Sequence, residues 1–372
     1  MADPRPRLQT RDLLGPVAVF LGALLLAVAF AVGPLLGESL RKVPMDIDQT
    51  MVADGADGAE LLNRCSLDRP RAEVVGGQVQ QRRRVVTVRP ANSDVVTLQA
   101  GTALGVDSYL IDGRSVKPEQ ACAEPTLAAT LDRVTLDRRT AEPTGESEVQ
   151  FDDERAASVI TDREGFTYLL PFGFDRDGLR YYDVTTRQSL PMAADGTETM
   201  DGRELVRFVV DVPETDLSQV QDDPRTVLVK PASWFGEFAG VTPDQELTAA
   251  LHHRAQRVLF VDAATGVLVS ERAEITEVFR FTGDALRQPV LADFTLTSLQ
   301  TTLSSDRQTI TEAADYAAGR AWPVTVATRV VPIVAGVLGV LLLAAGIWQL
   351  RRQSAADQNR RAADEDADDT VD

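Results

Sequence analysis

Two long stretches without a charged residue constrain this chain more than any other feature of its sequence. They cover residues 13–36 and 330–350. At about 1.5 Å per residue, an α-helix of either length can cross a hydrocarbon layer about 30 Å thick. The first stretch is longer than the apolar region of a cleavable signal peptide, which is the alternative to an anchor at this position. We therefore predict two transmembrane helices, over residues 13–36 and 324–350.

The basic residues beside these stretches predict their orientation. Short cytoplasmic flanks carry an excess of Arg and Lys. Arginines lie near both chain ends, at Arg5, Arg7, Arg11, Arg351, Arg352, Arg360 and Arg361. Both ends are therefore expected in the cytoplasm, although Arg41 and Arg329 on the inner flanks act in the opposite direction. Residues 1–12 form a short N-terminus, and residues 351–372 form an acidic tail that we expect to be disordered, because it has few large apolar side chains.

The segment between the two stretches is acidic and rich in strand patterns. The chain has a net charge of -18, most of it in this segment, so binding to nucleic acid is not expected. Apolar and polar residues alternate with a period of two, which is typical of half-buried strands. The strand candidates are 84–88, 95–99, 130–136, 167–170, 205–212, 226–229, 257–261, 267–281 and 294–303.

Turn residues between these candidates predict hairpins and hence antiparallel pairing. Asp201-Gly202 and the segment 263–266 each separate two apolar runs. After Ser305, residues 305–323 are predicted to form a capped helix that leads to the membrane. The predicted fold class is therefore a membrane-anchored α+β protein: two transmembrane helices flank a mostly antiparallel β domain, residues 37–304, outside the cytoplasmic membrane.

Cys65 and Cys122 are the two cysteines of the chain, and both lie in this middle segment. In an oxidising extracytoplasmic compartment, a disulfide between them is the simplest interpretation. Two buried thiols are the alternative, because two cysteines alone indicate little.

Common catalytic and cofactor motifs are absent from the sequence. It contains no HExxH, GxSxG, P-loop, GxGxxG or CxxC pattern. Adjacent His252 and His253 point to opposite faces of a strand, so they cannot chelate one metal together, and a solvated pair is expected. We therefore predict no enzyme activity, no cofactor and no metal. The acidic clusters of residues 54–60 and 175–177 indicate Asp-Gly turns more than calcium loops.

Two groups of aromatic residues are candidates for ligand contact. The first lies in a Pro- and Gly-flanked loop and is predicted to be exposed: it comprises Trp234, Phe235 and Phe238. The second could line a hydrophobic groove, although a sheet core is the more common place for such residues. Its members are Phe166, Tyr168, Phe172, Phe174, Tyr181 and Tyr182.

The order of several sequence segments indicates a family. The segments are VPMDIDQTMVADG, YLLPFGFDRDGLRYYDVTTRQSLPM, DGRELVRFVVDVPET, RVLFVDAATGVLVS and RVVPIVAGVLGVLLLAAG. In this order the chain resembles, from about Leu14 to Gly346, the actinobacterial PorA-type family, formerly a domain of unknown function with a porin label. The resemblance implies a two-span envelope protein of mycolate-type or related bacteria that is associated with channel activity. It implies no catalytic residues.

These observations favour a non-enzymatic, membrane-anchored cell-envelope protein. Its β domain would bind or pass hydrophobic envelope components, or act as a scaffold for their handling. The expected partners are the lipid bilayer, envelope lipids or other envelope proteins. The protein could also form an oligomer. An apolar tunnel would support this role. The alternative is the porin-like channel implied by the family label, although the strand candidates are short for a lipid-embedded barrel. A carboxylate-based enzyme acting on cell-wall glycans is a weaker alternative.

Overall fold

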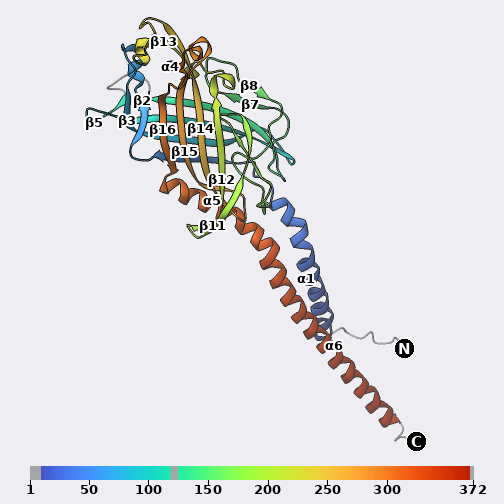
Figure 1. Ribbon diagram of the computed structural model, residues 1–372. Helices are drawn as coiled ribbons and strands as arrows, with labels where there is room; N and C mark the ends of the chain where they lie inside the picture. The colour runs from blue at the N-terminus through green and yellow to red at the C-terminus, as the bar shows by residue number, and fades with distance from the viewer. Residues whose placement is uncertain (1–9, 119–124, 369–372) are drawn as a thin grey trace. The chain divides into compact units, whose positions relative to one another are not determined.

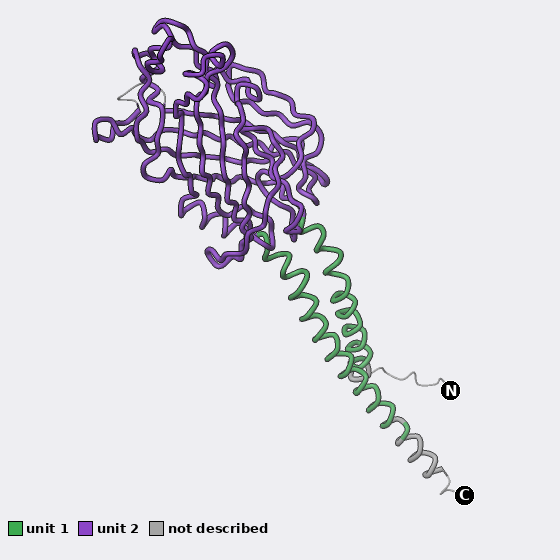
Figure 2. Tube along the Cα trace, in the orientation of Figure 1, with its two compact units in different colours: residues 1–41, 320–372 green, residues 42–319 purple. Residues whose placement is uncertain are grey.

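The computed structural model describes residues 10–118 and 125–368. The chain forms two compact units, which Figure 2 colours separately. Unit 1 contains residues 1–41 and 320–372, and unit 2 contains residues 42–319. Unit 1 is helical, and unit 2 consists mainly of β-strands.

Unit 1 is a pair of antiparallel helices that lie side by side (Figure 1). Helix α1 covers Thr10–Leu40, and helix α6 covers Val331–Asp368. Helix α5, Arg307–Thr325, begins in unit 2 and continues into a π-helical turn, η5, Val326–Val330, directly before α6. By length and composition, α1 and the continuous α5–α6 segment each contain a stretch that can cross a membrane.

Glycines spaced seven residues apart let the two helices of unit 1 approach closely. A Cβ atom on Gly22 would lie 2.8 Å from the backbone oxygen of Gly339. One on Gly346 would lie 2.9 Å from the backbone oxygen of Gly15. Side chains larger than hydrogen therefore do not fit at this seam, a packing typical of helices in lipid. A period of seven keeps the small residues on one side of each helix.

The C-terminal tail differs from the prediction. Helix α6 continues through the charged segment to Asp368, where the sequence predicted disorder after residue 350. The segment has few large apolar side chains, but Ala, Arg, Gln and Glu are favourable helix formers and an existing helix extends at low cost. A low content of apolar residues therefore excluded a packed core here without excluding a helix.

Unit 2 contains the strands of the fold. Their bounds are β1 (Asp48–Gly55), β2 (Ala59–Leu62), β3 (Val74–Ala91), β4 (Val95–Ile111), β5 (Arg114–Val116), β6 (Thr126–Asp137), β7 (Ser147–Gln150), β8 (Ser158–Ile160), β9 (Arg180–Asp183), β10 (Gln188–Pro191), β11 (Ala193–Met200), β12 (Arg203–Asp216), β13 (Val227–Pro231), β14 (Glu246–Asp262), β15 (Leu268–Phe281) and β16 (Leu296–Ser305). Short helices connect them: η1 (Arg64–Asp68), η2 (Leu217–Gln219), η3 (Pro224–Thr226), α3 (Ala232–Phe235), η4 (Gly283–Arg287) and α4 (Pro289–Ala292).

Fourteen of these strands form one antiparallel sheet. Its main order is β11-β12-β14-β15-β16-β1-β3-β4-β6-β7-β8, and β9 and β10 form a separate pair. Figure 1 shows that the sheet folds back on itself, so that β12, β14, β15 and β16 cross over β3 and β4. Strand β1 pairs with both β16 and β3 and thereby joins the two groups. This arrangement confirms the prediction of a mostly antiparallel β domain with helices.

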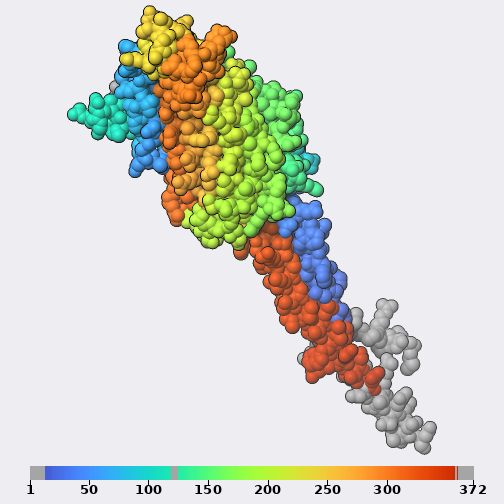
Figure 3. Space-filling view, viewed as in Figure 1, coloured from blue at the N-terminus to red at the C-terminus, as the bar shows by residue number. Residues whose placement is uncertain are grey.

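The core lies between the two crossing groups of strands. One buried cluster combines Val79 and Tyr109 from β3 and β4 with Val212, Ile275 and Leu303 from β12, β15 and β16. Inward and outward residues alternate along each strand, as expected for a sheet with one buried face. The face formed by β12 to β16 is closed by packed side chains (Figure 3).

Turn and cap residues show where the sequence predictions hold. Asp201 and Gly202 have φ values of 45° and 74° and connect β11 to β12, which confirms that hairpin. The helix predicted from Ser305 begins at Arg307, because the Asp306 carboxylate accepts a hydrogen bond from the Thr309 N–H at 2.6 Å. Ser305 itself belongs to β16.

Candidate functional site

The loop predicted to be an exposed contact site is buried, so that prediction is wrong. Trp234 is 1% exposed and Phe235 is 7% exposed. The Trp234 Nε1–H donates to the Ser66 carbonyl at 2.9 Å, and Phe235 packs edge-on against Phe281 at 4.9 Å between ring centroids. Phe238 is partly buried against the same cluster. Backbone hydrogen bonds from Ala232 to Gln245 and from Ser233 to Pro243 hold this loop against the segment that precedes β14.

The second aromatic group is part of the core. Tyr181 and Tyr182 are buried, and Phe174 lies 5.9 Å from Phe208 between ring centroids. The cavity beside Phe166, Tyr168 and Tyr181 has a volume of only about 20 Å³. The six residues, including half-buried Phe172, therefore do not line a groove, and the core interpretation holds.

Charged side chains occupy the interior of unit 2, which no sequence pattern led us to expect. Arg83 of β3 donates to the Glu271 carboxylate of β15 at 2.9 Å. Glu271 also accepts from Arg257 of β14 at 2.8 Å, and Arg257 donates to Asp183 of β9 at 3.0 Å. All four side chains are buried. This chain of four alternating charges connects the two crossing groups of strands.

Electrostatics stabilises the ionised form of both carboxylates in this network. Burial raises the pKa of Asp183, but Arg257, His253 and the hydrogen bonds from Thr186 outweigh it, so the pKa lies below its ordinary value. Burial raises the pKa of Glu271 in the same way, and the charges of Arg83 and Arg257 lower it further than burial raises it. Both groups are therefore stabilised in the ionised form although they are buried.

A second buried network is centred on Asp132 of β6. Arg163 donates to both oxygens of Asp132, at 2.6 and 3.0 Å, and its guanidinium carbon lies 4.3 Å from the centre of the Tyr182 ring. The Tyr168 hydroxyl also donates to Asp132. Burial and the Asp132 charge raise the pKa of Tyr168 well above its ordinary value, so the phenol keeps its proton and acts as a donor.

A polar chamber lies beside these networks inside the sheet. Its volume is about 90 Å³. Its charged and titratable lining groups are Arg64, Asp223, Arg225, His253, Arg257 and Glu277. Arg225 donates to Asp223 at 2.9 Å, and His253 Nδ1 lies 2.9 Å from the Glu277 carboxylate.

The two histidines lie on opposite sides of β14, as predicted. His253 is 2% exposed and faces the chamber, whereas His252 lies near Glu214, 3.6 Å from its carboxylate. The expectation of a solvated pair is therefore wrong for His253. The sequence did not indicate which of the two histidines is buried, because adjacent residues on a strand point to opposite faces and have different environments.

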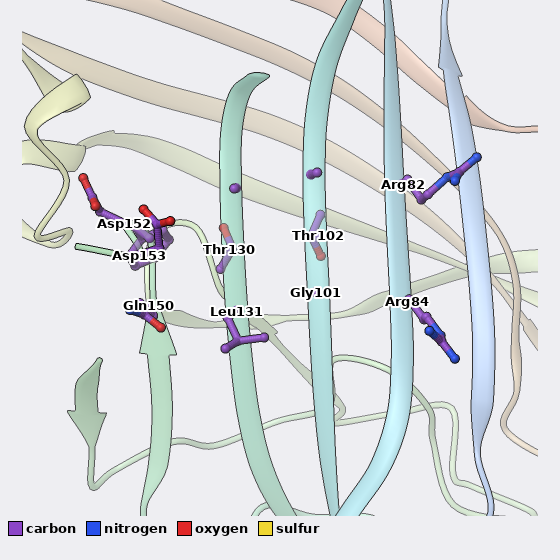
Figure 4. Close-up of a pocket in the computed structure, with 12 residues that line it drawn as sticks. Arg82, Arg84, Gly101, Thr102, Thr130, Leu131, Gln150, Asp152 and Asp153 are labelled. Carbon is purple, nitrogen blue, oxygen red and sulfur yellow. The ribbon is translucent and has the colours of Figure 1, made fainter. Parts of the chain in front are cut away.

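A shallow groove of about 410 Å³ lies on the outer face of β3, β4, β6 and β7 (Figure 4). Small residues form its floor, at Gly101, Ala103 and Ala129, and Leu131 contributes an exposed apolar side chain. Its charged rims come from Arg82 and Arg84 on β3 and from Asp152 and Asp153 beyond β7. Figure 4 shows the two rims on opposite sides of the floor, with Arg84 turned toward β1, where it pairs with Asp48.

The acidic clusters of the sequence form turns in the structure. The Asp175 carboxylate accepts the Asp177 N–H at 3.3 Å. Asp54 and Asp57 accept from Gln80 and Gln78 on β3. Within the described residues, no group of three or more His, Cys, Asp or Glu side chains is arranged to hold a metal ion.

The cysteine pair is only partly within the described chain. Cys65 lies in η1, where its N–H donates to the Asn63 side chain at 3.1 Å. Cys122 lies outside the described residues, so a bridge between Cys65 and Cys122 stays a prediction.

Comparisons with known proteins decide the family. A family model described as Porin PorA matches residues 14–348. The chain belongs to the Porin PorA family. The resemblance found in the sequence is thereby confirmed.

Two relatives carry the same family name. A Porin PorA of Corynebacterium amycolatum is 23% identical over 394 residues, which cover 92% of this chain and 99% of that protein. A Porin PorA of Corynebacterium resistens is 26% identical over 235 residues, which cover 56% of this chain and 54% of that protein. Among solved structures, a beta-barrel-like protein of a domain of unknown function from Brucella abortus covers 71% of this chain and 100% of its own, with 9% identity and a TM-score of 0.13. That score does not establish a common fold.

The residues that sequence reasoning missed are the buried arginines. In β3, Val79, Gln81, Arg83 and Val85 have the same parity, so the alternation that buries both valines also points Arg83 inward. That parity was the available sign. The parity of Arg83 was hard to recognise because Arg82 and Arg84 are exposed and a run of three arginines is typical of a solvated segment.

Proposed function

We propose that this chain is a non-enzymatic cell-envelope protein, anchored in the cytoplasmic membrane by α1 and α6, whose β unit binds or scaffolds envelope components on the extracytoplasmic side. The observation that carries the proposal is the division of its surface. Large apolar side chains are exposed on the helices, and charged side chains are exposed on the sheet.

The helices of unit 1 have the surface of a lipid-facing pair. Phe30 is 81% exposed, and Phe20, Ile333 and Leu341 also lie outside the glycine seam. Exposed apolar surface of this extent is unfavourable in water and favourable in a bilayer. Because the seam joins α1 to α6 within one chain, the pair presents its remaining faces to the surroundings.

The outward face of the sheet has the opposite character. Arg254 and Gln256 on β14 and Arg272 and Glu274 on β15 are exposed. A lipid-embedded barrel requires an apolar outward band, since a charge near the bilayer midplane costs about 2–4 kcal/mol. The β unit is therefore suited to an aqueous compartment.

The family name supports a porin-like role as a second candidate function. The interior of the β unit is filled by ion pairs and apolar clusters, and one pair of helices encloses no lumen. A conducting form of this protein would therefore need helices from several copies or from a partner. Planar-bilayer recordings over a range of protein concentrations test this: steps that rise steeply with concentration support an oligomeric channel, and silence from folded protein excludes it.

Passage of lipid through the β unit has less support than binding. The interior chamber is polar, and the larger groove is shallow and lies on the outer face. Neither of these two spaces is an apolar tunnel, which would have supported passage. Binding or scaffolding therefore enters the proposal, and transport through the sheet does not.

Cysteine labelling in spheroplasts tests the anchoring. Asp112→Cys places a thiol in the exposed β4–β5 turn, and Ser354→Cys places one on α6 beyond its apolar part. A membrane-impermeant maleimide should label the first variant in intact spheroplasts and the second only after lysis, with the unsubstituted protein as background. Labelling of Ser354→Cys but not Asp112→Cys before lysis would overturn the proposed orientation.

A further inference from the structure

We propose that the polar chamber of the β unit is a binding site for one oxyanion group, a carboxylate or a phosphate, held by the guanidinium of Arg64. The inference deepens the proposed binding role by naming a ligand class. It rests on that role only where the ligand is an envelope amphiphile.

Among the described residues, Arg64 differs from Arg83, Arg163 and Arg257 because no carboxylate pairs with it. Its Nη2 atom is 3.5 Å from the Leu127 carbonyl, at the limit of a hydrogen bond, and its Nε–H has no partner among the described residues. Arg83, Arg163 and Arg257 each have a carboxylate within 3.0 Å. Arg64 is thus a half-buried cation that lines the chamber and whose buried Nε–H has no partner among the described residues.

The electrostatics of Arg64 agrees with a missing counter-ion. Burial lowers the pKa of Arg64, and the charges of Glu277 and Asp223 only partly compensate. At Arg257, by contrast, the surrounding Tyr181, Asp183 and Glu271 outweigh burial and raise the pKa. An anion beside Arg64 would supply the interaction that Arg257 obtains from the protein itself.

The other charges of the chamber favour a ligand of low negative charge. Arg225 is paired with Asp223, and Arg257 is paired with Asp183 and Glu271. Glu277 faces His253, so a multiply charged anion would meet repulsion from Glu277. Arg64 is the remaining cation, and its planar donor fork suits a carboxylate or phosphate bound through two oxygens.

His253 provides a second group for the same ligand. It is buried and lines the chamber, its Nδ1 faces Glu277, and its Nε2 has no partner among the described residues. Nε2 can accept from a hydroxyl of the ligand, or donate to an oxygen when the ring is protonated. One water needs about 10–15 Å³, so the 90 Å³ chamber has room for a group of several atoms.

The oxyanion can come from a free ion or from the head of an amphiphile. The outer groove and the chamber share Thr102, Ala129, Thr130 and Phe151 as lining residues, so the two spaces adjoin. To place its head group at Arg64 and its chain along the apolar groove floor, an amphiphile would have to pass these shared residues. A free ion and the head group of an amphiphile would present the same kind of oxygen atoms to Arg64. A binding experiment can distinguish the two ligands.

Calorimetric titration of the full-length protein in an uncharged detergent tests the site. The probes are inorganic phosphate, acetate, dodecyl phosphate and, as the uncharged comparison, dodecanol. We expect binding of at least one anionic probe and weakening by at least tenfold in Arg64→Met. Dodecyl phosphate bound much more tightly than inorganic phosphate indicates an amphiphile, and equal affinities indicate a free ion.

Two further variants keep the test decisive. Arg64→Lys retains the charge but loses the two-point fork, so an intermediate loss of affinity is expected even if Arg64→Met does not fold. Arg114→Met removes an exposed arginine of β5 and should leave the affinity unchanged. Absence of binding by every anionic probe, or equal affinity in wild type and the folded Arg64 variants, overturns the anion site. Neither result affects the anchoring, which the labelling experiment decides separately.

Discussion

At the residue scale, the interior of the β unit depends on paired charges as much as on apolar contacts. Arg83 and Arg257 both donate to Glu271, and Arg257 also donates to Asp183. Buried ion pairs are not intrinsically more stabilising than apolar residues of the same size, but removing one partner leaves an uncompensated charge. These residues therefore make the two strand groups interdependent.

Replacing Glu271 should destabilise the fold strongly. In Glu271→Gln, the amide is neutral, and Arg83 loses its carboxylate while Arg257 keeps only Asp183. We expect a loss of about 3–5 kcal/mol in the free energy of unfolding, measured by urea denaturation. Glu274→Gln, on the exposed side of the same strand, is the control and should change the free energy by less than about 0.5 kcal/mol. Equal effects of the two variants would contradict the role of the network.

Acid should weaken the same network. The folded-state pKa values of Asp183 and Glu271 lie below their ordinary values, which are about 3.9 and 4.3 in unfolded chains. Their contribution to stability is therefore fully present above the unfolded values and is lost as the pH falls through the folded values. The melting temperature of the wild type should fall between about pH 5 and pH 2, and it should fall less in Glu271→Gln. Parallel curves for the two proteins would show that Glu271 does not contribute.

The predicted disulfide is tested at Cys65. If Cys65 is bridged to Cys122, Cys65→Ser should lower the free energy of unfolding by about 2–5 kcal/mol under oxidising conditions. The difference between variant and wild type should vanish when both are reduced. An unchanged melting temperature in oxidising buffer would mean that no bridge stabilises the protein.

At the scale of elements, the helix pair of unit 1 depends on particular glycines. Gly22 faces the backbone of α6, where a Cβ would lie 2.8 Å from the Gly339 oxygen and the Leu343 nitrogen. Gly33, on the same helix, would have no atom within 4 Å of a Cβ. The two positions therefore differ in packing across the seam, and Gly33 also directly precedes Pro34, whose ring disfavours a side chain at the preceding helical residue.

Gly22→Leu should separate the helices, and Gly33→Leu should not. We expect Gly22→Leu to lower the melting temperature of the protein in detergent, because backbone atoms cannot move aside as a flexible side chain can. Gly33→Leu should lower it much less, since no atom of α6 lies near this position and the higher helix propensity of leucine offsets part of the cost of a side chain before Pro34. If the melting temperature fell equally in both variants, the added side chain itself and not the helix seam would cause the effect.

Element prediction succeeded where local chemistry decided the outcome. The Asp201-Gly202 hairpin followed from residues that tolerate positive φ, and both have it. It failed where distant contacts decided the outcome. Residues 167–170 read as a strand but belong to none, and the true length of β3, residues 74–91, was missed because its central arginines interrupt the apolar alternation.

At the scale of the whole molecule, the two units differ in the surface that each exposes. Unit 1 exposes large apolar side chains, and unit 2 exposes charged ones. The same contrast argues against reading the porin label as a lipid-embedded sheet. If the protein conducts ions, several helices would have to assemble into the pore. The bilayer recordings test whether such assemblies exist.

The candidate site belongs to this scale because its residues come from remote parts of the chain. Arg64 lies in η1 and His253 in β14, and they line one chamber because the sheet folds back on itself. No spacing rule in the sequence joins two such positions. The aromatic residues that the sequence suggested as contact sites instead pack in the core, since a sheet domain must bury its largest apolar side chains.

The sequence by itself determined the two apolar helices, the antiparallel β domain between them and the family, because length without charge, period-two alternation and the order of segments are local properties of the chain. Only the tertiary structure decided which polar residues lie inside. Whether Arg83 is buried while Arg82 is exposed, or whether Arg64 pairs with a carboxylate among the described residues, depends on which strands lie over each arginine. Burial and charge pairing are properties of the assembled sheet, and they can be recognised only after remote strands have met.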